Sequence, residues 1–239
     1  MSIISRLFIT AHSGCMNTRQ NSHASVLAGI REGADMMEVD IRATKDDHVV
    51  LYHDESIITS DGSKLLRELP YEALNDVILL ENVLPYIKMN NRTINLDVKE
   101  DNAIAPMIRI IEHFDMQNQV LITGCEKERA AFIKAHYPTY KVLLNASFAL
   151  FETCDYSSYV QQTIADAIDS KSDGINIHYQ HCREELLESA KANRLPVYVW
   201  TVDQPTDMVK FMQLGVQSIT TNNVKTLVHL RNEYTHISK

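Results

Sequence analysis

The sequence lacks both a long apolar run and a basic segment. No apolar stretch approaches the roughly 18 residues of a membrane-spanning helix, so membrane insertion is not expected. Lys and Arg number 23 against 31 Asp and Glu, which gives a formal net charge of −8. A nucleic-acid partner is not expected, because no basic run is present to neutralise phosphates. A small phosphate ester, which needs only a local cationic spot, is compatible with this charge.

Glycine and proline are scarce, with 7 and 6 residues among 239. No stretch rich in Gly, Pro or Ser separates two parts of the chain, so residues 1–239 are expected to form one domain. No glycine-rich loop follows the first predicted strand, which argues against a dinucleotide-binding fold. Hydrophobic residues make up 45% and charged residues 23%, as in globular rather than disordered proteins.

The four cysteines, Cys15, Cys125, Cys154 and Cys182, show no metal-binding spacing such as Cys-x-x-Cys. A chain of this size has a large core and does not need disulfides, so free thiols in a reducing compartment are expected. Residues 1–10 contain one Arg and a short apolar run without a cleavage site, which predicts a first strand rather than a signal peptide. These features together predict a cytoplasmic protein.

Short apolar runs alternate with segments of helical periodicity along the chain. The predicted strands cover residues 7–11, 36–42, 93–99, 120–122, 140–144, 174–177, 196–200 and 216–219. The predicted helices cover residues 22–32, 81–88, 104–114, 127–135, 160–170, 183–192, 206–214 and 224–231. Eight such units over this length favour an α/β fold of the (β/α)8 TIM barrel type over an open doubly wound sheet.

A further strand, residues 48–52, follows the second barrel strand after only a few residues. A parallel return needs a dozen or more residues, so this strand is expected to form an antiparallel hairpin arm after strand 2. A turn centred on Lys45 and Asp46 would bring His53 opposite Glu38. Residues 55–64, which follow, are polar and are expected to be turn-like.

Charged and apolar residues alternate in the second strand. Glu38, Asp40 and Arg42 are separated by apolar residues, and in a strand residues i, i+2 and i+4 point to one face. The apolar neighbours indicate a buried strand, and buried carboxylates need a metal or another cation. The alternative is a solvated edge strand.

In barrels of this type the active site lies at the carboxyl ends of the strands. Polar or aromatic residues near these ends are His12, Glu38, Asp40, His53, Asp97, Lys99 and Trp200. Three carboxylates would form an oxygen-rich site for one divalent cation, Mg²⁺ or Ca²⁺, whereas no His or Cys cluster has zinc spacing. Two histidines beside the cation suit acid–base catalysis, and a lysine suits an anionic substrate. The set predicts phosphoryl-transfer chemistry.

Each of these residues alone has a simpler interpretation. A histidine at a strand end is more often a hydrogen-bonded core residue, Lys99 alone would be a solvated strand end, and Trp200 alone would be a core residue. The agreement of several such residues on one rim carries the prediction.

The same segments resemble the glycerophosphodiester phosphodiesterase family of phospholipase C-like barrels. The family's opening H-R-G is matched by His12-Ser13-Gly14, its E-N-T by Gln20-Asn21-Ser22, and its G-A-D-x-x-E-x-D-V by residues 33–41. Its T-K-D-G turn and H-D pair are matched by residues 44–47 and His53-Asp54. Its x-E-x-K is matched by residues 96–99 and its V-W-T-V by residues 199–202.

The resemblance implies a TIM barrel that cleaves glycerophosphodiesters, which are small phosphodiesters, to glycerol 3-phosphate and an alcohol. It implies that His12 and His53 are the catalytic acid–base pair. Glu38, Asp40 and Asp97 would be the metal ligands, and Lys99 would lie near the phosphate.

Three departures from the family pattern bear on activity. Ser13 replaces the phosphate-binding Arg, Gln20 replaces a Glu, and Asn222-Asn223-Val224 replaces a T-D-x-P ending. The segment between His53 and the third barrel strand is short, which implies that the larger inserted subdomain of some members is absent. An open mouth and small water-soluble substrates are therefore expected.

Alternatives follow from the missing Arg. Arg42, on the face of Asp40, is predicted to bind phosphate together with Lys99 in its place; alternatively, Arg42 neutralises an acid. A second possibility is a catalytically silent barrel that binds a phosphodiester metabolite. A third is an enzyme acting on lysophospholipids, which would require an apolar groove at the mouth. The sequence makes no prediction of oligomeric state.

Overall fold

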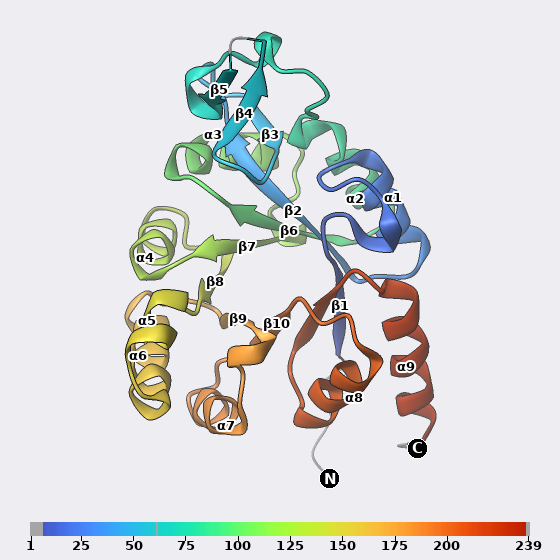
Figure 1. The fold of residues 1–239 in the computed structure, drawn as a ribbon, viewed down its shortest axis with the longest axis vertical. Coiled ribbons are helices and arrows are strands. Elements are labelled where there is room, and N and C mark those ends of the chain that lie inside the picture. The colour runs from blue at the N-terminus through green and yellow to red at the C-terminus, as the bar shows by residue number, and fades with distance from the viewer. Residues whose placement is uncertain (1–6, 61, 238–239) are drawn as a thin grey trace.

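The structure is a computed structural model that describes residues 7–60 and 62–237. Eight parallel strands form a closed ring, because β1 pairs with both β2 and β11 (Figure 1). The strands of the ring are β1 Phe8–Ala11, β2 Met36–Ala43, β6 Thr93–Val98, β7 Val120–Cys125, β8 Lys141–Asn145, β9 Ile175–His178, β10 Val197–Trp200 and β11 Ser218–Thr221. The predicted (β/α)8 barrel is confirmed.

Helices surround the ring (Figure 1). They are α1 His23–Arg31, α2 Leu84–Met89, α3 Ile104–His113, α4 Lys127–His136, α5 Phe148–Thr153, α6 Tyr156–Asp169, α7 Glu184–Ala192, α8 Pro205–Leu214 and α9 Val224–Ile237. The prediction missed α5 and placed the start of α6 too late. Asp155 caps α6 by accepting from the backbone N–H of Ser158, which fixes the start of the helix four residues before the predicted one.

The predicted hairpin arm is β3, Val49–Leu51, which pairs antiparallel with β2. Its predicted register is wrong by one residue, because Ile41 pairs with Leu51 and strand pairing ends before His53. The N–H of Thr44 donates to the carbonyl of His48, and Asp47 has a positive φ of 63°. The connection is therefore a three-residue loop whose last residue is left-handed.

The polar segment predicted to be turn-like is instead a second hairpin. β4, Ser56–Thr59, pairs antiparallel with β5, Gly62–Leu65. The hairpin projects from one end of the molecule, beyond β3 (Figure 1). Short 3-10 turns and α2 complete the described chain between His53 and β6, so this part contains no large inserted subdomain.

Strand β2 lies inside the barrel wall rather than at an edge. It pairs with β1 on one side and with β6 on the other, and every one of its residues is buried. The solvated edge strand is therefore excluded, and the carboxylates of Glu38 and Asp40 are held away from bulk water.

Two other expectations concern the cysteines and membrane insertion. All four cysteines are free. Among the described residues, none of the helices has the length and apolar character needed to cross a bilayer.

Candidate active site

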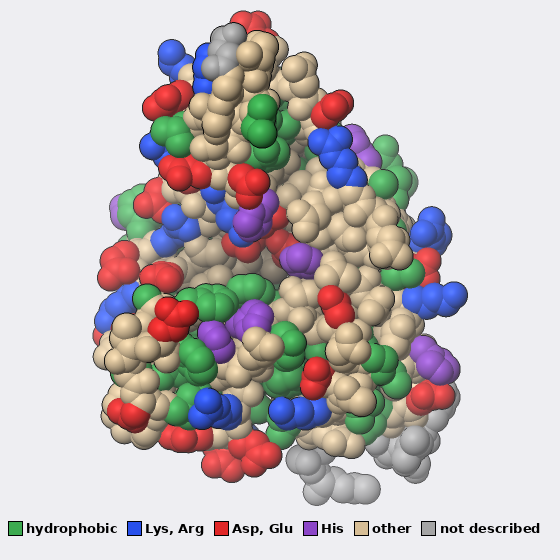
Figure 2. All heavy atoms as spheres, in the orientation of Figure 1, with side chains coloured by type: hydrophobic (Ala, Val, Ile, Leu, Met, Phe, Trp, Pro, Cys, Tyr) green, Lys and Arg blue, Asp and Glu red, His purple; other side chains and the backbone are tan. Residues whose placement is uncertain are grey.

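A cavity of about 570 Å³ opens at the carboxyl ends of the barrel strands. Figure 2 looks into this hollow, around which acidic and histidine side chains gather. It is lined by residues that include His12, Glu38, Asp40, His53, Asn95, Asp97, Lys99, Asn145, Phe148, Asn176 and Trp200. All site residues predicted from the sequence except Arg42 line this one cavity.

Three carboxylates form the base of the site. Glu38 and Asp40 come from β2, and Asp97 lies directly opposite Asp40 on the neighbouring strand β6. Each contributes one oxygen to a set whose members lie within 4.8 Å of one another. Parallel pairing of β2 with β6, and the two-residue period of each strand, bring these side chains together.

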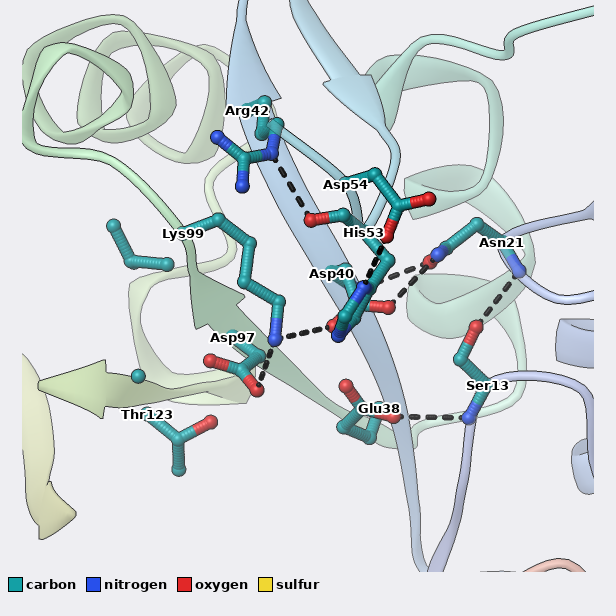
Figure 3. Close-up of polar contacts among 12 residues, drawn as sticks. Ser13, Asn21, Glu38, Asp40, Arg42, His53, Asp54, Asp97, Lys99 and Thr123 are labelled. Atoms are coloured by element: carbon teal, nitrogen blue, oxygen red, sulfur yellow. Dashed lines mark hydrogen bonds and ion pairs between the residues drawn. The ribbon is translucent and has the colours of Figure 1, made fainter. Parts of the chain in front are cut away.

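The loop after β1 clamps the two carboxylates of β2 (Figure 3). The N–H of Ser13 donates to Glu38 Oε2 at 2.9 Å. Asn21 donates through Nδ2 to Asp40 Oδ2 at 2.8 Å and accepts from the N–H of Asp40 at 3.0 Å. Ser13 Oγ accepts from the N–H of Asn21, and Ser13 is 1% exposed. Ser13 is therefore a buried part of the clamp.

Lys99 joins two of the three carboxylates. Its Nζ lies 2.8 Å from Asp40 Oδ1 and 3.0 Å from Asp97 Oδ2. Burial alone would lower the pKa of Lys99, but attraction by Asp97 and Asp40 outweighs it and raises the pKa above its ordinary value. Lys99 therefore carries a fixed positive charge.

Lys99 leaves the acidic cluster with unbalanced charge. Burial, followed by repulsion from Asp40 and Asp97, raises the pKa of Glu38 well above its ordinary value. Asp97 Oδ1 is buried and has no hydrogen-bond partner. When all three carboxylates are ionised, as a bound cation would favour, one ammonium leaves two negative charges unbalanced, and Asp97 keeps one unused oxygen. The donor set therefore fits a hard divalent cation.

Gly124 leaves space for Oδ1 of Asp97, the oxygen without a hydrogen-bond partner. It has a positive φ of 73° at the end of β7, and a side chain there would fall on Asp97 Oδ1. Its N–H donates to Asn145 Oδ1 at 3.0 Å. Only glycine combines this backbone conformation with such a close approach.

The two histidines lie beside different carboxylates. His12 Nε2 lies 3.9 Å from Glu38 Oε2, and its Nδ1 lies 3.0 Å from Asn222 Oδ1. His53 Nδ1 lies 2.9 Å from the exposed carboxylate of Asp54. Both rings line the cavity, so each can reach a substrate above the acidic cluster.

Arg42 has contacts other than those predicted from the sequence. Its Nε donates to the backbone carbonyl of His53 at 3.1 Å, and its Nη1 lies 3.1 Å from Glu100 Oε1. Figure 3 shows Arg42 with a dashed contact to His53 and none to Asp40 or Asp97. Arg42 does not line the cavity, and its predicted contact with phosphate stays a prediction.

Sequence reasoning assigned no role to several residues of the cavity. Asn95, Asn145 and Asn176 line its floor, and Phe148 stands at the mouth with its ring centroid 5.9 Å from that of Trp200. Asn95 lies two residues before Asp97, so strand periodicity was an available signal. Asn145 and Asn176 have no such marker.

Most of the residues that line the cavity are polar. Among the described residues that line it, the apolar side chains are those of Val98, Ala146, Phe148 and Trp200. Phe148 and Trp200 lie side by side among them, with ring centroids 5.9 Å apart, and the lysophospholipid interpretation stays a prediction.

Two segments of the chain, residues 12–91 and 78–226, match the model of the glycerophosphoryl diester phosphodiesterase family. Together they cover most of the barrel and all predicted site residues. A relative from Caldanaerobacter subterraneus subsp. tengcongensis, a glycerophosphodiester phosphodiesterase, is 24% identical over 94% of this chain and 98% of its own.

Solved structures share the fold. A glycerophosphodiester phosphodiesterase from Parabacteroides distasonis has a TM-score of 0.80 at 18% identity and covers 97% of this chain and 99% of its own. An Oleispira antarctica phosphodiesterase, solved with the product sn-glycerol-3-phosphate, has a TM-score of 0.78 at 18% identity over 95% of this chain and 96% of its own. On the extent of the family match, the chain belongs to the glycerophosphoryl diester phosphodiesterase family.

Proposed function

We propose that this protein hydrolyses glycerophosphodiesters to glycerol 3-phosphate and an alcohol, with the help of one divalent cation. One observation carries the proposal: a single cavity holds the three clustered carboxylates, Lys99 and two histidines. Family membership supports the reaction class, and a relative of the same fold was solved with sn-glycerol-3-phosphate as its product.

Glu38, Asp40 and Asp97 would hold the cation, either Mg²⁺ or Ca²⁺. A bound divalent ion supplies positive charge that offsets the carboxylates and polarises the phosphoryl oxygens. Among the chain's own groups, the Ser13 N–H and the side chain of Asn21 orient Glu38 and Asp40 for this task. Such orientation by hydrogen-bonded neighbours is a general feature of metal sites.

His12 and His53 are proposed to carry the protons. Hydrolysis breaks the bond between phosphorus and the alcohol oxygen and forms one between phosphorus and a water oxygen. One proton must leave the water and one must reach the departing alcohol oxygen. Two histidines that line the same cavity can accept the first and deliver the second.

Lys99 and Trp200 are proposed as substrate contacts. The side chain of Lys99 is 20% exposed and lines the cavity, so its ammonium can attract the phosphate. The phosphate oxygens gain charge during the reaction, so a fixed positive charge stabilises the transition state more than the ground state. Trp200 and Phe148 form an aromatic wall against which the uncharged part of a small diester can pack.

The second candidate is a silent barrel that binds a phosphodiester without cleaving it. Ser13 favours it, because this residue stands where the family has a phosphate-binding Arg and its side chain is occupied by the N–H of Asn21. The cavity then lacks one cation that active members use.

The test is hydrolysis of glycerophosphocholine and glycerophosphoethanolamine, with Mg²⁺, with Ca²⁺ and with a chelator. We expect turnover that the chelator abolishes and one of the two ions restores. A matched control is Asp169→Asn, which removes an exposed acid paired with Lys127 on the outside of the barrel and should leave turnover unchanged. Binding of the diesters without turnover under every condition would support the silent barrel instead.

A further inference from the structure

His12 is tied to the last strand of the barrel by its ring. Its Nδ1 lies 3.0 Å from Oδ1 of Asn222, which directly follows β11. The N–H of His12 also donates to the carbonyl of Thr221 at 3.0 Å. Both the backbone and the ring of His12 are therefore held by one short segment, on the side of the ring opposite Glu38.

Asp203 determines which way the amide of Asn222 points. The backbone N–H of Asn222 donates to Asp203 Oδ1 at 2.7 Å, and Asn222 Nδ2 donates to Asp203 Oδ2 at 2.9 Å. A carboxylate only accepts hydrogen bonds, so the NH₂ group of Asn222 must face Asp203. The amide oxygen of Asn222 must then face His12.

The position of the proton on His12 follows from this orientation. An amide oxygen only accepts, so the nitrogen that faces it must carry hydrogen. In a neutral imidazole one nitrogen is a donor and the other an acceptor. The 3.9 Å from Nε2 to Glu38 Oε2 is too long for a hydrogen bond that would favour the other arrangement.

We propose that Asp203 and Asn222 are positioning residues that fix His12 in the Nδ1–H form and leave the lone pair of Nε2 directed at the cavity. Neither residue lines the cavity, so both act through His12. The proposal rests on the proposed function for its kinetic consequence, which is that His12 is ready to accept a proton. The hydrogen-bond chain itself does not depend on that function.

This arrangement gives a reason for one departure from the family motif. The family's T-D-x-P ending has an acid where this chain has Asn222. An aspartate at position 222 would place two carboxylates at the 2.9 Å that now separates Asn222 Nδ2 from Asp203 Oδ2, and like charges at that distance repel. Asn222 and Asp203 therefore form a matched pair.

The first test reads the proton directly. ¹⁵N-histidine labelling with nuclear magnetic resonance distinguishes a protonated from an unprotonated ring nitrogen, and the signals of His12 are identified by their loss in His12→Gln. We expect Nδ1 to carry the proton in the natural chain. In Asn222→Ala this preference should be lost. Asn223→Ala is the matched control, because Asn223 donates only to the backbone carbonyl of Asp203 through its side chain.

The second test exchanges the pair. Asn222→Asp alone should lower kcat about 10- to 100-fold, as loss of an orienting partner does, while KM stays constant. The double variant Asp203→Asn plus Asn222→Asp should restore kcat to within a few-fold, since an amide at 203 can again donate to an acceptor at 222. A merely structural role would not predict rescue by exchange.

Two results would overturn the proposal. One is a proton on Nε2 of His12 in the natural chain, or a proton position that Asn222→Ala leaves unchanged. The other is a double variant no more active than Asn222→Asp although both are folded by circular dichroism. If the natural chain cleaves no glycerophosphodiester, the proposed function fails, and the labelling experiment still decides on the hydrogen-bond chain.

Discussion

The two histidines of the cavity are held in different ways. His12 is 30% exposed in its side chain, and its ring is fixed by Asn222, which is fixed in turn by Asp203. His53 is 61% exposed, and its ring contacts Asp54, whose own side chain is 74% exposed. The contact of His53 with a buried side chain is instead made by its backbone carbonyl, which accepts a hydrogen bond from Nε of Arg42.

This difference follows from where each histidine lies in the fold. His12 follows a barrel strand and sits between two others, so hydrogen bonds to its ring are shielded from water. His53 lies on the hairpin arm, where a chain of ion pairs links Arg42, Glu100, Arg67 and Glu55. Exposed ion pairs contribute little individually, so the buried guanidinium of Arg42 is the main anchor. The ring of His12 is held by a partly buried contact, whereas the ring of His53 is held by an exposed one.

The largest effect is expected from removing the carboxylates that both histidines face. Glu38→Gln plus Asp40→Asn should abolish binding of Mg²⁺ or Ca²⁺ and with it turnover, since Asp97 and Lys99 alone carry no net negative charge. Titration calorimetry measures the binding. Asp169→Asn, an acid outside the barrel, should bind the ion like the natural chain. Unchanged affinity in the double variant would rule out this metal site.

Replacing each histidine by alanine should lower kcat about 10²- to 10⁴-fold if both transfer protons. Steady-state kinetics on one diester measures kcat and KM separately. The thermal unfolding midpoint should fall more for His12→Ala, because it leaves Oδ1 of Asn222 without its hydrogen-bond donor. A rise in KM at constant kcat would show that the histidine only positions the substrate.

A smaller effect is expected from Arg42. Arg42→Met should lower kcat about 10-fold with little change in KM, because it frees the backbone at His53. In a double-mutant cycle, Arg42→Met should lower kcat little further when His53 is already alanine, since Arg42 and His53 act as one unit. The control is Arg67→Met, which removes an exposed guanidinium from the same ion-pair chain.

The sequence-based prediction for Arg42 gives a different result. If the guanidinium binds phosphate in place of the missing family Arg, Arg42→Met should raise KM. The loss of kcat/KM should then be the same in the natural chain and in the His53→Ala variant. The cycle therefore separates a phosphate ligand from an anchor of the hairpin arm.

The smallest effect is expected from Asp54→Asn. Its carboxylate is largely in water and contacts His53 at 2.9 Å, so solvent and salt screen the interaction. We expect a change in kcat of no more than about two-fold. Activity measured at low and high salt provides the check. A ten-fold loss would mean that the ring of His53 is held as firmly as that of His12.

Strand periodicity was sufficient to predict the barrel and the shared face of Glu38 and Asp40. The shared face follows from the two-residue period of a single strand. The barrel follows from the regular alternation of strands and helices along the chain. The hairpin register was missed because one left-handed residue, Asp47, shifts every pair in the arm. The orienting contacts of Asn21 and Asn222 were missed because an amide in a loop has no pattern of its own.

Closure of the ring between β1 and β11 has a consequence for how the chain becomes active during synthesis. The acids proposed to bind the metal lie on β2 and β6, which leave the ribosome early, whereas the partner of His12 is 210 positions further along. Contacts of such long sequence separation form late. A nascent chain that has not yet released β11 is therefore expected to lack the oriented His12. Proteolytic loss of that strand and of the residues after it should leave a fragment that keeps the three acids and His12 but lacks Asn222, the partner that orients the ring.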